Sequence, residues 1–481
     1  MKHFKSYLSI VALLLSLSSL SLSAQDFIGF NTTPYAGVNA IDLQPASIAG
    51  TVYKADITAV GASIFAHNNF AQFDPKAFYS WSLDPDKSSI MKDANGLTNI
   101  YTNTRVQLPS VMYDIDYNSA VALTIQHRSS FQLEGLSPEV SQLYYSDFQN
   151  EDYLGQSYTS GVDMRMLSWM EIGLTYGHVL LIGQDQRLKF GARVKYLGGL
   201  SSAYLSSDLV TYEAQDSSTL NITKGNFDYA HSANLDPYKF SPESSSIGFD
   251  LGIKYSYGNR IIFGVSVLDI GKLRFDKAED SGNFALNNSS INLNEANYGG
   301  FETANASNWE LGLANYNGLN GFDEMLKDEA QFSTTTEQDY EVALPTAVSL
   351  QFTAYLWESG VFEGGGYQNI YINVATYHAL NTNPDMNRIT AFNTYTITPG
   401  VYTLSVAAGM PVTIMNNLES TRVGMFMRLG PFVFGSKNFV SHLFADSVNE
   451  LDLYAALKVP ILKPKPSLVK GCPKFRKKNR Y

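Results

Sequence analysis

The sequence predicts an all-β protein, an antiparallel transmembrane β-barrel of about 14 strands with an N-terminal plug segment. The first observation is alternation: from Leu188 to Tyr196 every second residue is apolar, and each residue between is charged or glycine. Such a strand has one apolar and one polar face. The same pattern recurs over residues 247–257. Repeated alternation predicts a closed wall with lipid outside and water inside.

Composition is the second observation. Charged residues make up 16% of the chain and aromatic residues 13%, with 30 tyrosines, whereas soluble proteins average about 25% charged residues. Tyrosines are typical of the girdles where a barrel wall meets lipid headgroups. After the first 24 residues no apolar run of about 18 residues occurs, which excludes a helical membrane protein. The net charge of −11 argues against nucleic acid as a partner.

The two ends of the chain set the expected domains. Lys2 and Lys5 precede an apolar stretch that ends at Ala24, as in a secretory signal peptide. The single cysteine, Cys472, excludes an internal disulfide framework. From Lys463 onward the chain has basic residues and no acidic one. We therefore expect a signal peptide (1–24), a plug segment (25–53), an outer-membrane barrel (54–462) and a basic periplasmic tail (463–481).

Matching the alternation along the chain predicts the strands in order, and the connections agree with them. Long connections follow odd-numbered strands and short links follow even-numbered ones, including turns at Gly258–Asn259, Pro399–Gly400 and Gly430–Pro431. Outer-membrane barrels have this asymmetry, with short periplasmic turns. The expected strands are Ala55–Ala66, Val106–Tyr117, Ser119–Ser130, Leu167–His178, Arg187–Leu197, Ser246–Tyr257, Arg260–Ile270, Val342–Leu356, Tyr367–Ala379, Arg388–Ile397, Val401–Val412, Ser420–Leu429, Pro431–Ser436 and Glu450–Pro460. Asp208–Ala214 fits either an extra strand or a hairpin extension.

The expected plug segment loses the alternation and is rich in small residues. Its run Gln44-Pro45-Ala46 resembles the Asn-Pro-Ala motif before the first strand of FadL-like fatty-acid transporter barrels, with glutamine in place of asparagine. Together with Tyr35–Asn39 and Arg428–Ser436, this run looks like an uncharacterised outer-membrane β-barrel family of the Bacteroidota, a domain of unknown function. The resemblance implies a plugged barrel in the outer membrane, and the family's motifs are structural.

Inward-facing charges are the candidate functional residues. In the expected register they line the lumen, where they either border a water-filled path or form a paired network that stiffens the wall. Six histidines of the mature chain lie at or beyond strand ends without a nucleophile or metal motif, so we expect no catalytic, cofactor or metal site. The lumen-facing candidates are Glu171, Lys189, Arg193, Lys195, Asp250, Lys254 and Arg428, and the plug-motif candidates are Gln44, Pro45 and Ala46.

These features favour a non-enzymatic barrel that admits or transfers a small hydrophobic or amphipathic compound across the outer membrane of a Gram-negative bacterium. Both termini are expected in the periplasm. The expected partners are outer-membrane lipid and a hydrophobic small molecule. An alternative is a structural or assembly scaffold that binds a periplasmic or surface protein without transport. A soluble β-rich exported protein is the third alternative, and it would bury Phe190, Val194 and Ile253 in one core.

Overall fold

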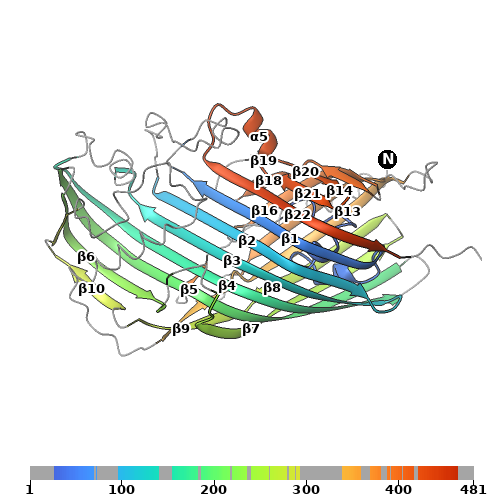
Figure 1. The fold of residues 1–481 in the computed structure, drawn as a ribbon. Coiled ribbons are helices and arrows are strands. Elements are labelled where there is room, and N and C mark those ends of the chain that lie inside the picture. Colours follow the sequence, from blue (N-terminus) through green and yellow to red (C-terminus); the bar gives the residue numbers. More distant parts are fainter. Residues whose placement is uncertain are drawn as a thin grey trace, which may run out of the picture.

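A computed structural model of the chain shows an elongated barrel of tilted strands (Figure 1). The expected signal peptide, Cys472 and nearly all of the basic tail lie outside the described residues. The structure describes residues 27–69, 72, 96–139, 154–181, 186–216, 219–233, 235, 240–258, 260–278, 281–287, 289–292, 339–358, 369–380, 387–389, 392–403, 405–415 and 421–463.

The predicted fold class is confirmed: over these residues the wall is a closed antiparallel barrel with 14 strand positions. Closure comes from β1 and β22, which pair from Tyr53 with Leu462 to His67 with Glu450. The wall consists of β1 (Tyr53–Asn68), β2 (Thr98–Asp114), β3 (Ser119–Leu136), β4 (Ser157–Leu181), β5 (Gln186–Asp216), β7 (Ser244–Tyr257), β8 (Ile261–Ile270), β13 (Ala347–Glu358), β14 (Asn369–Ala379), β16 (Thr394–Tyr402), β17 with β18 (Val406–Gly409 and Val412–Met415), β19 with β20 (Thr421–Val423 and Met425–Leu429), β21 (Phe432–Ser436) and β22 (Glu450–Leu462).

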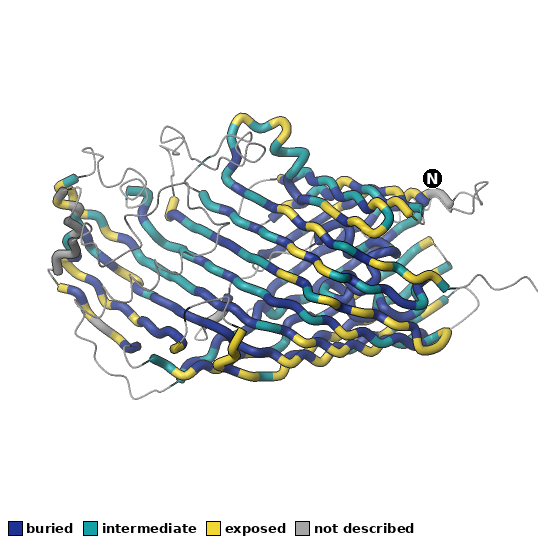
Figure 2. Tube along the Cα trace, in the orientation of Figure 1, coloured by how far each residue is buried: buried dark blue, intermediate teal, exposed yellow. Residues whose placement is uncertain are grey.

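Side-chain alternation gives the wall its two faces, as the alternating colours along the strands show (Figure 2). On β5 and β7 the apolar residues point outward: Val194 is 50% exposed, and its cross-strand partner Phe249 is 45% exposed. Arg193 and Lys195 beside Val194 are 2% and 0% exposed. A soluble sandwich would bury the opposite set, so the alternative of a water-soluble β protein is wrong.

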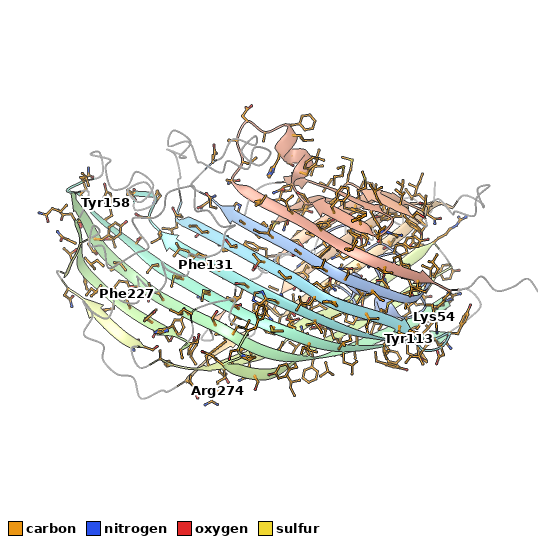
Figure 3. All side chains as sticks on the ribbon, in the orientation of Figure 1. Lys54, Tyr113, Phe131, Tyr158, Phe227 and Arg274 are labelled. Carbon is orange, nitrogen blue, oxygen red and sulfur yellow. The ribbon has the colours of Figure 1, made fainter. Side chains whose placement is uncertain are left out.

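The ends of the barrel differ. We call the end with the short links the turn end; it holds the start of β1 and the end of β22. There Lys54 lies over the Tyr113 ring at 4.5 Å (Figure 3). At the opposite end, called the loop end, β4 and β5 run for 25 and 31 residues, well beyond the roughly 10 residues that span a membrane. Tyr158 and Phe227 mark this extension (Figure 3).

The loop-end extension resolves one alternative left open by the sequence. Asp208–Ala214 is part of β5, which pairs from Ala203 onward with β6 (Thr219–His231). It is therefore a hairpin extension and not a separate wall strand. Two short strands, β10 (Gly282–Leu286) and β11 (Ser289–Asn292), widen the hairpin by pairing with β6.

Two expected strands are wrong in part. Val342–Leu356 is divided at Pro345, which lacks an N–H: β12 (Asp339–Ala343) lies in another sheet, and the wall strand β13 starts at Ala347. Arg388–Ile397 is likewise divided into β15 (Asn387–Arg388) and the later β16.

The expected turn at Pro399–Gly400 is also wrong, because both residues lie inside β16 and pair with β14. Gly400 leaves space for a ring, since a Cβ there would lie 2.6 Å from Tyr371. The chain turns instead after Tyr402, where the Thr403 N–H donates to the Val406 carbonyl at 2.6 Å.

A second, three-stranded sheet packs inside the loop end. It consists of β9 (Lys272–Asp276), β12 and β15. Its side chains Leu273, Phe275 and Val342 form one buried cluster with the wall residues Trp169 and Leu197. Helix is scarce in the described residues: η1 (Gly37–Ala40), η2 (Pro45–Ile48) and α5 (Phe439–Leu443) are single turns. None of the described helices has the length and apolar character needed to cross a membrane.

We predict that a charge on the outer face destabilises the barrel. Val194→Arg should lower the free energy of unfolding in lipid vesicles by about 2–4 kcal/mol, because the guanidinium would replace an apolar side chain against hydrocarbon. Denaturant titration followed by tryptophan fluorescence measures the change, and Val194→Leu is the control. Equal stability of the Arg and Leu variants would contradict a lipid-facing position.

Candidate lumen site

Residues 27–51, here called the N-terminal segment, lie against the inner face of the wall. Nearly all of them are buried, from Phe27 through Ala49. Positive φ values at Gly29, Gly37 and Gly50 let the chain bend back on itself. A Cβ on Gly37 would lie 1.9 Å from the Asp56 carboxylate, so only glycine fits there. The N-terminal segment, which lacks alternation, thus forms a compact coil and not a strand.

A row of wall glycines forms a seat for residues 44–49, which include Gln44, Pro45 and Ala46. Gly177, Gly191 and Gly252 are direct cross-strand neighbours on β4, β5 and β7. A Cβ on Gly191 would lie 2.4 Å from the Pro45 carbonyl carbon, and one on Gly252 would lie 1.8 Å from Gln44 Oε1. The backbone of the segment therefore approaches the wall closely at the motif that the sequence singled out.

Gln44 fixes the segment to the wall and starts η2. Its Oε1 accepts from the Ala46 N–H at 3.2 Å, which caps the helical turn. Its Nε2 donates to the carbonyls of Ile253 at 3.2 Å and Val265 at 3.1 Å, on β7 and β8. Because glutamine is longer than asparagine, the Gln44 side chain can cap η2 and still reach the wall.

Four of the predicted lumen residues meet in one buried charge network. Lys195 Nζ lies 2.9 Å from Asp250 and 4.0 Å from Glu171. Arg193 Nη1 lies 3.3 Å from Asp250. Glu171 also accepts from Trp169 Nε1 at 2.8 Å. Charges of both signs are thus paired, as burial requires.

The network includes partners that the sequence did not single out. Arg128 on β3 bridges Glu171 and Asp269, each at 3.0 Å, and Lys195 also pairs with Asp269. Strict alternation would place Asp269 on the outer face with Val265 and Val267. A β-bulge opposite Asp250 turns it inward, with φ of +54°. Arg128 could have been predicted from the sequence, because it lies two residues after Gln126 and therefore on the same face of the predicted strand Ser119–Ser130.

Asp42 joins the N-terminal segment to this network. Its carboxylate lies 2.8 Å from Arg193 and 3.2 Å from Arg105 on β2. Burial by itself would raise the pKa of Asp42, but the two guanidinium groups outweigh it and hold the pKa below its usual value. The segment therefore carries the anion that completes the pairing of two wall cations.

A second anchor lies across the lumen, on β1 and β22. Lys458 Nζ lies 2.9 Å from Asp56 and 3.0 Å from Asn39 Oδ1, and Asp56 accepts from the Val38 N–H at 2.8 Å. Neither wall residue was singled out from the sequence. The pair holds η1 against the closing seam of the barrel.

Arg428, a predicted lumen residue, belongs to neither network. Its guanidinium lies 5.0 Å from the Tyr35 ring and 3.5 Å from the Tyr53 hydroxyl. Tyr35 packs edge-on to Tyr402 at 5.3 Å, and Tyr402 packs edge-on to Tyr355 at 6.0 Å. This side of the lumen is therefore aromatic.

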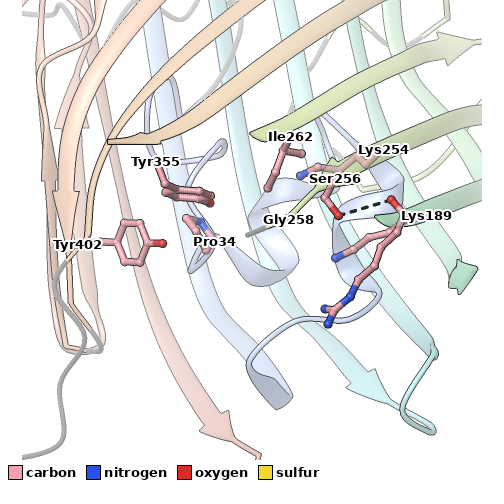
Figure 4. Close-up of a pocket in the computed structure, with 9 residues that line it drawn as sticks. Pro34, Lys189, Lys254, Ser256, Gly258, Ile262, Tyr355 and Tyr402 are labelled. Atoms are coloured by element: carbon pink, nitrogen blue, oxygen red, sulfur yellow. Dashed lines mark hydrogen bonds between the residues drawn. The ribbon is translucent and has the colours of Figure 1, made fainter. Parts of the chain in front are cut away.

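Lys189 and Lys254, the remaining predicted residues, lie at the turn end. Lys189 Nζ donates to the Ala49 carbonyl at 2.7 Å, and Lys254 Nζ donates to Ser47 Oγ at 3.2 Å. With Arg187 they border a cavity of about 230 Å³. Figure 4 shows the two lysines on one side of Pro34, with Tyr355 and Tyr402 on the other. The functional role of all seven lumen residues stays a prediction.

We predict that filling the glycine seat displaces the segment. Gly191→Leu should increase the rate at which a water-soluble maleimide labels Ala46→Cys at least ten-fold, in a Cys472→Ser background, because the side chain would occupy the position of the Pro45–Ala46 backbone. Ala192→Leu places the same bulk on the opposite face of β5 and is the control. Equal labelling in both variants would contradict the seat.

Comparison with known proteins identifies a family. The family of unknown function DUF5723 matches residues 45–436; the uncharacterised family expected from the sequence is thereby confirmed, and its link to the Bacteroidota stays a prediction. No curated protein matches. Among similar solved structures, a TodX ΔS2S3 mutant monoaromatic hydrocarbon channel has 10% sequence identity and a TM-score of 0.37, and the match covers 92% of this chain and 95% of that one. A Pseudomonas aeruginosa FadL homologue has 10% identity and a TM-score of 0.37, with coverage of 92% of this chain and 99% of that one. The Ralstonia pickettii toluene transporter TbuX has 8% identity and a TM-score of 0.31, with coverage of 88% of this chain and 94% of that one. Because the family match runs from Pro45 in the N-terminal segment to Ser436 at the end of β21, the chain belongs to the family of unknown function DUF5723.

Proposed function

We propose that this outer-membrane β-barrel admits or transfers a small hydrophobic or amphipathic compound, and that the N-terminal segment closes the lumen between transfer events. The turn end then faces the periplasm, with both termini. In this proposal the protein is not an enzyme and carries no cofactor.

The inner face of the wall carries the proposal. Its residues Glu171, Arg193, Lys195 and Asp250 are charged and buried, although replacement of a buried ion pair by apolar side chains is often neutral or stabilising. Ionised side chains are solvated well by water. A lumen from which the segment has withdrawn would therefore be a hydrated path through the membrane.

The independence of wall and segment supports the same function. The barrel closes through backbone pairing of β1 with β22, to which residues 27–51 contribute nothing. The segment is held by side-chain contacts, chiefly those of Asp42, Gln44 and Asn39. Such contacts can break and re-form while the wall stays intact, as a closing element requires.

Asp42 offers a direct test of transport. In planar bilayers and reconstituted vesicles, Asp42→Asn should raise ion conductance and the release of a small encapsulated amphipathic dye at least five-fold over the wild type, because two guanidinium groups lose their carboxylate. Asp42→Glu keeps the charge and is the control. Deletion of residues 27–50 should give the largest effect.

Absence of any flux would contradict transport. If neither the wild type, Asp42→Asn nor the deletion variant passes ions or dye, while all three fold, the barrel is no transport path. The scaffold alternative would then take its place.

A further inference from the structure

The turn-end cavity joins two unlike surfaces. Its volume is about 230 Å³, below the 300–1,000 Å³ of sites for drug-sized molecules. It lies between the N-terminal segment, which contributes Pro34, and five strands of the wall. A ligand here would be small and would touch both the segment and the wall.

One side of the cavity is apolar. Pro34, Ile262, Tyr355 and Tyr402 line it, and the two tyrosine rings meet edge-on at 6.0 Å. The rings are held in place, because Tyr402 also packs against Tyr371 at 5.7 Å. This side offers a preformed surface to an aromatic or alkyl group.

The other side is cationic. Lys189, Lys254 and the Ser256 hydroxyl line it (Figure 4), and Arg187 also borders the cavity. Within the described part of the chain, none of the three cations forms an ion pair with a carboxylate: the lysines donate to Ala49, Gly50 and Ser47 of the segment. In the central network, by contrast, Arg193 and Lys195 each meet carboxylates.

The neighbouring carboxylate already has a cationic partner. Asp114, at the end of β2, pairs with Lys463 at 2.6 Å. Three basic side chains border one small cavity, and an anion placed among them favours their charged forms. Ammonium, guanidinium and hydroxyl groups are the donors that bind carboxylates and phosphates.

We propose that this cavity is a binding site for a small organic carboxylate, with its anionic group on Arg187, Lys189 and Lys254 and its apolar body on Tyr355 and Tyr402. The apolar side favours an organic acid over inorganic phosphate, which has no apolar part. The inference goes beyond transport, because the ligand can bind at the turn end whether or not it crosses the lumen.

Calorimetric titration of the purified full chain in a non-ionic detergent tests the site without any membrane passage. 4-Phenylbutyrate should bind, and the neutral 4-phenylbutan-1-ol should bind at least ten-fold more weakly. Lys254→Met and Arg187→Gln should each weaken binding of the acid at least five-fold. Arg187 has no contact with the N-terminal segment among the described hydrogen bonds, so its variant separates ligand binding from displacement of the segment. Lys224→Met, an exposed lysine on β6, is the control and should bind like the wild type.

Three results would overturn the proposal. Equal affinity for acid and alcohol would show that the cations do not take part. Equal affinity for inorganic phosphate would show that the tyrosine side does not take part. Absence of binding in a folded wild type, shown by heat-modifiable mobility on gels, would exclude the site. That result would not change the conductance expected for the Asp42 variants, so the binding site and the transport function are tested separately.

Discussion

A wall that faces hydrocarbon on one side sends its polar residues to the other, and there they must find partners. This constraint governs the structure. The inner face of the barrel presents Arg105, Arg193 and Lys195 to a confined lumen, and carboxylates from several strands meet them. The N-terminal segment supplies one more, Asp42, to two of these cations. Contact of the segment with the inner face of the wall is thus a consequence of charge pairing as well as of packing.

Steric fit decides where the segment lies. A row of glycines on three neighbouring strands removes the side chains that would otherwise fill the space beside Pro45. The Gln44 amide then reaches main-chain carbonyls on β7, one of these strands, and on the next strand, β8. Because the glycines lie in register, the seat is a property of the sheet and not of any one strand.

The lumen is not uniform along its length. Its centre is a paired network around Lys195, whereas its turn end keeps three cations beside an aromatic surface. The loop end is packed by the sheet of β9, β12 and β15 against Trp169 and Leu197. A compound that passed through would meet apolar, mixed-charge and cationic surroundings in turn, which suits an amphipathic molecule better than a purely apolar one.

Local residue patterns were enough to predict the wall. Alternation with a period of two is a local property, so Val194 and Phe249 could be assigned to the outer face and Arg193 and Asp250 to the inner face without knowledge of their neighbours. Link lengths likewise gave the two ends. The break at Pro345 was missed and a turn was wrongly expected at Pro399, because a proline is tolerated or not according to the partner strand that it faces.

Which of the inward charges meet depends on the folded barrel. Lys189 and Lys195 share one strand and one face, yet one lies in the turn-end cavity and the other in the central network. Asp42 and Arg193 are 151 residues apart in sequence, and Asp269 faces inward only because of a bulge. Contacts across a lumen depend on barrel closure, on register and on local irregularities, and none of these is encoded in the residues next to the charge.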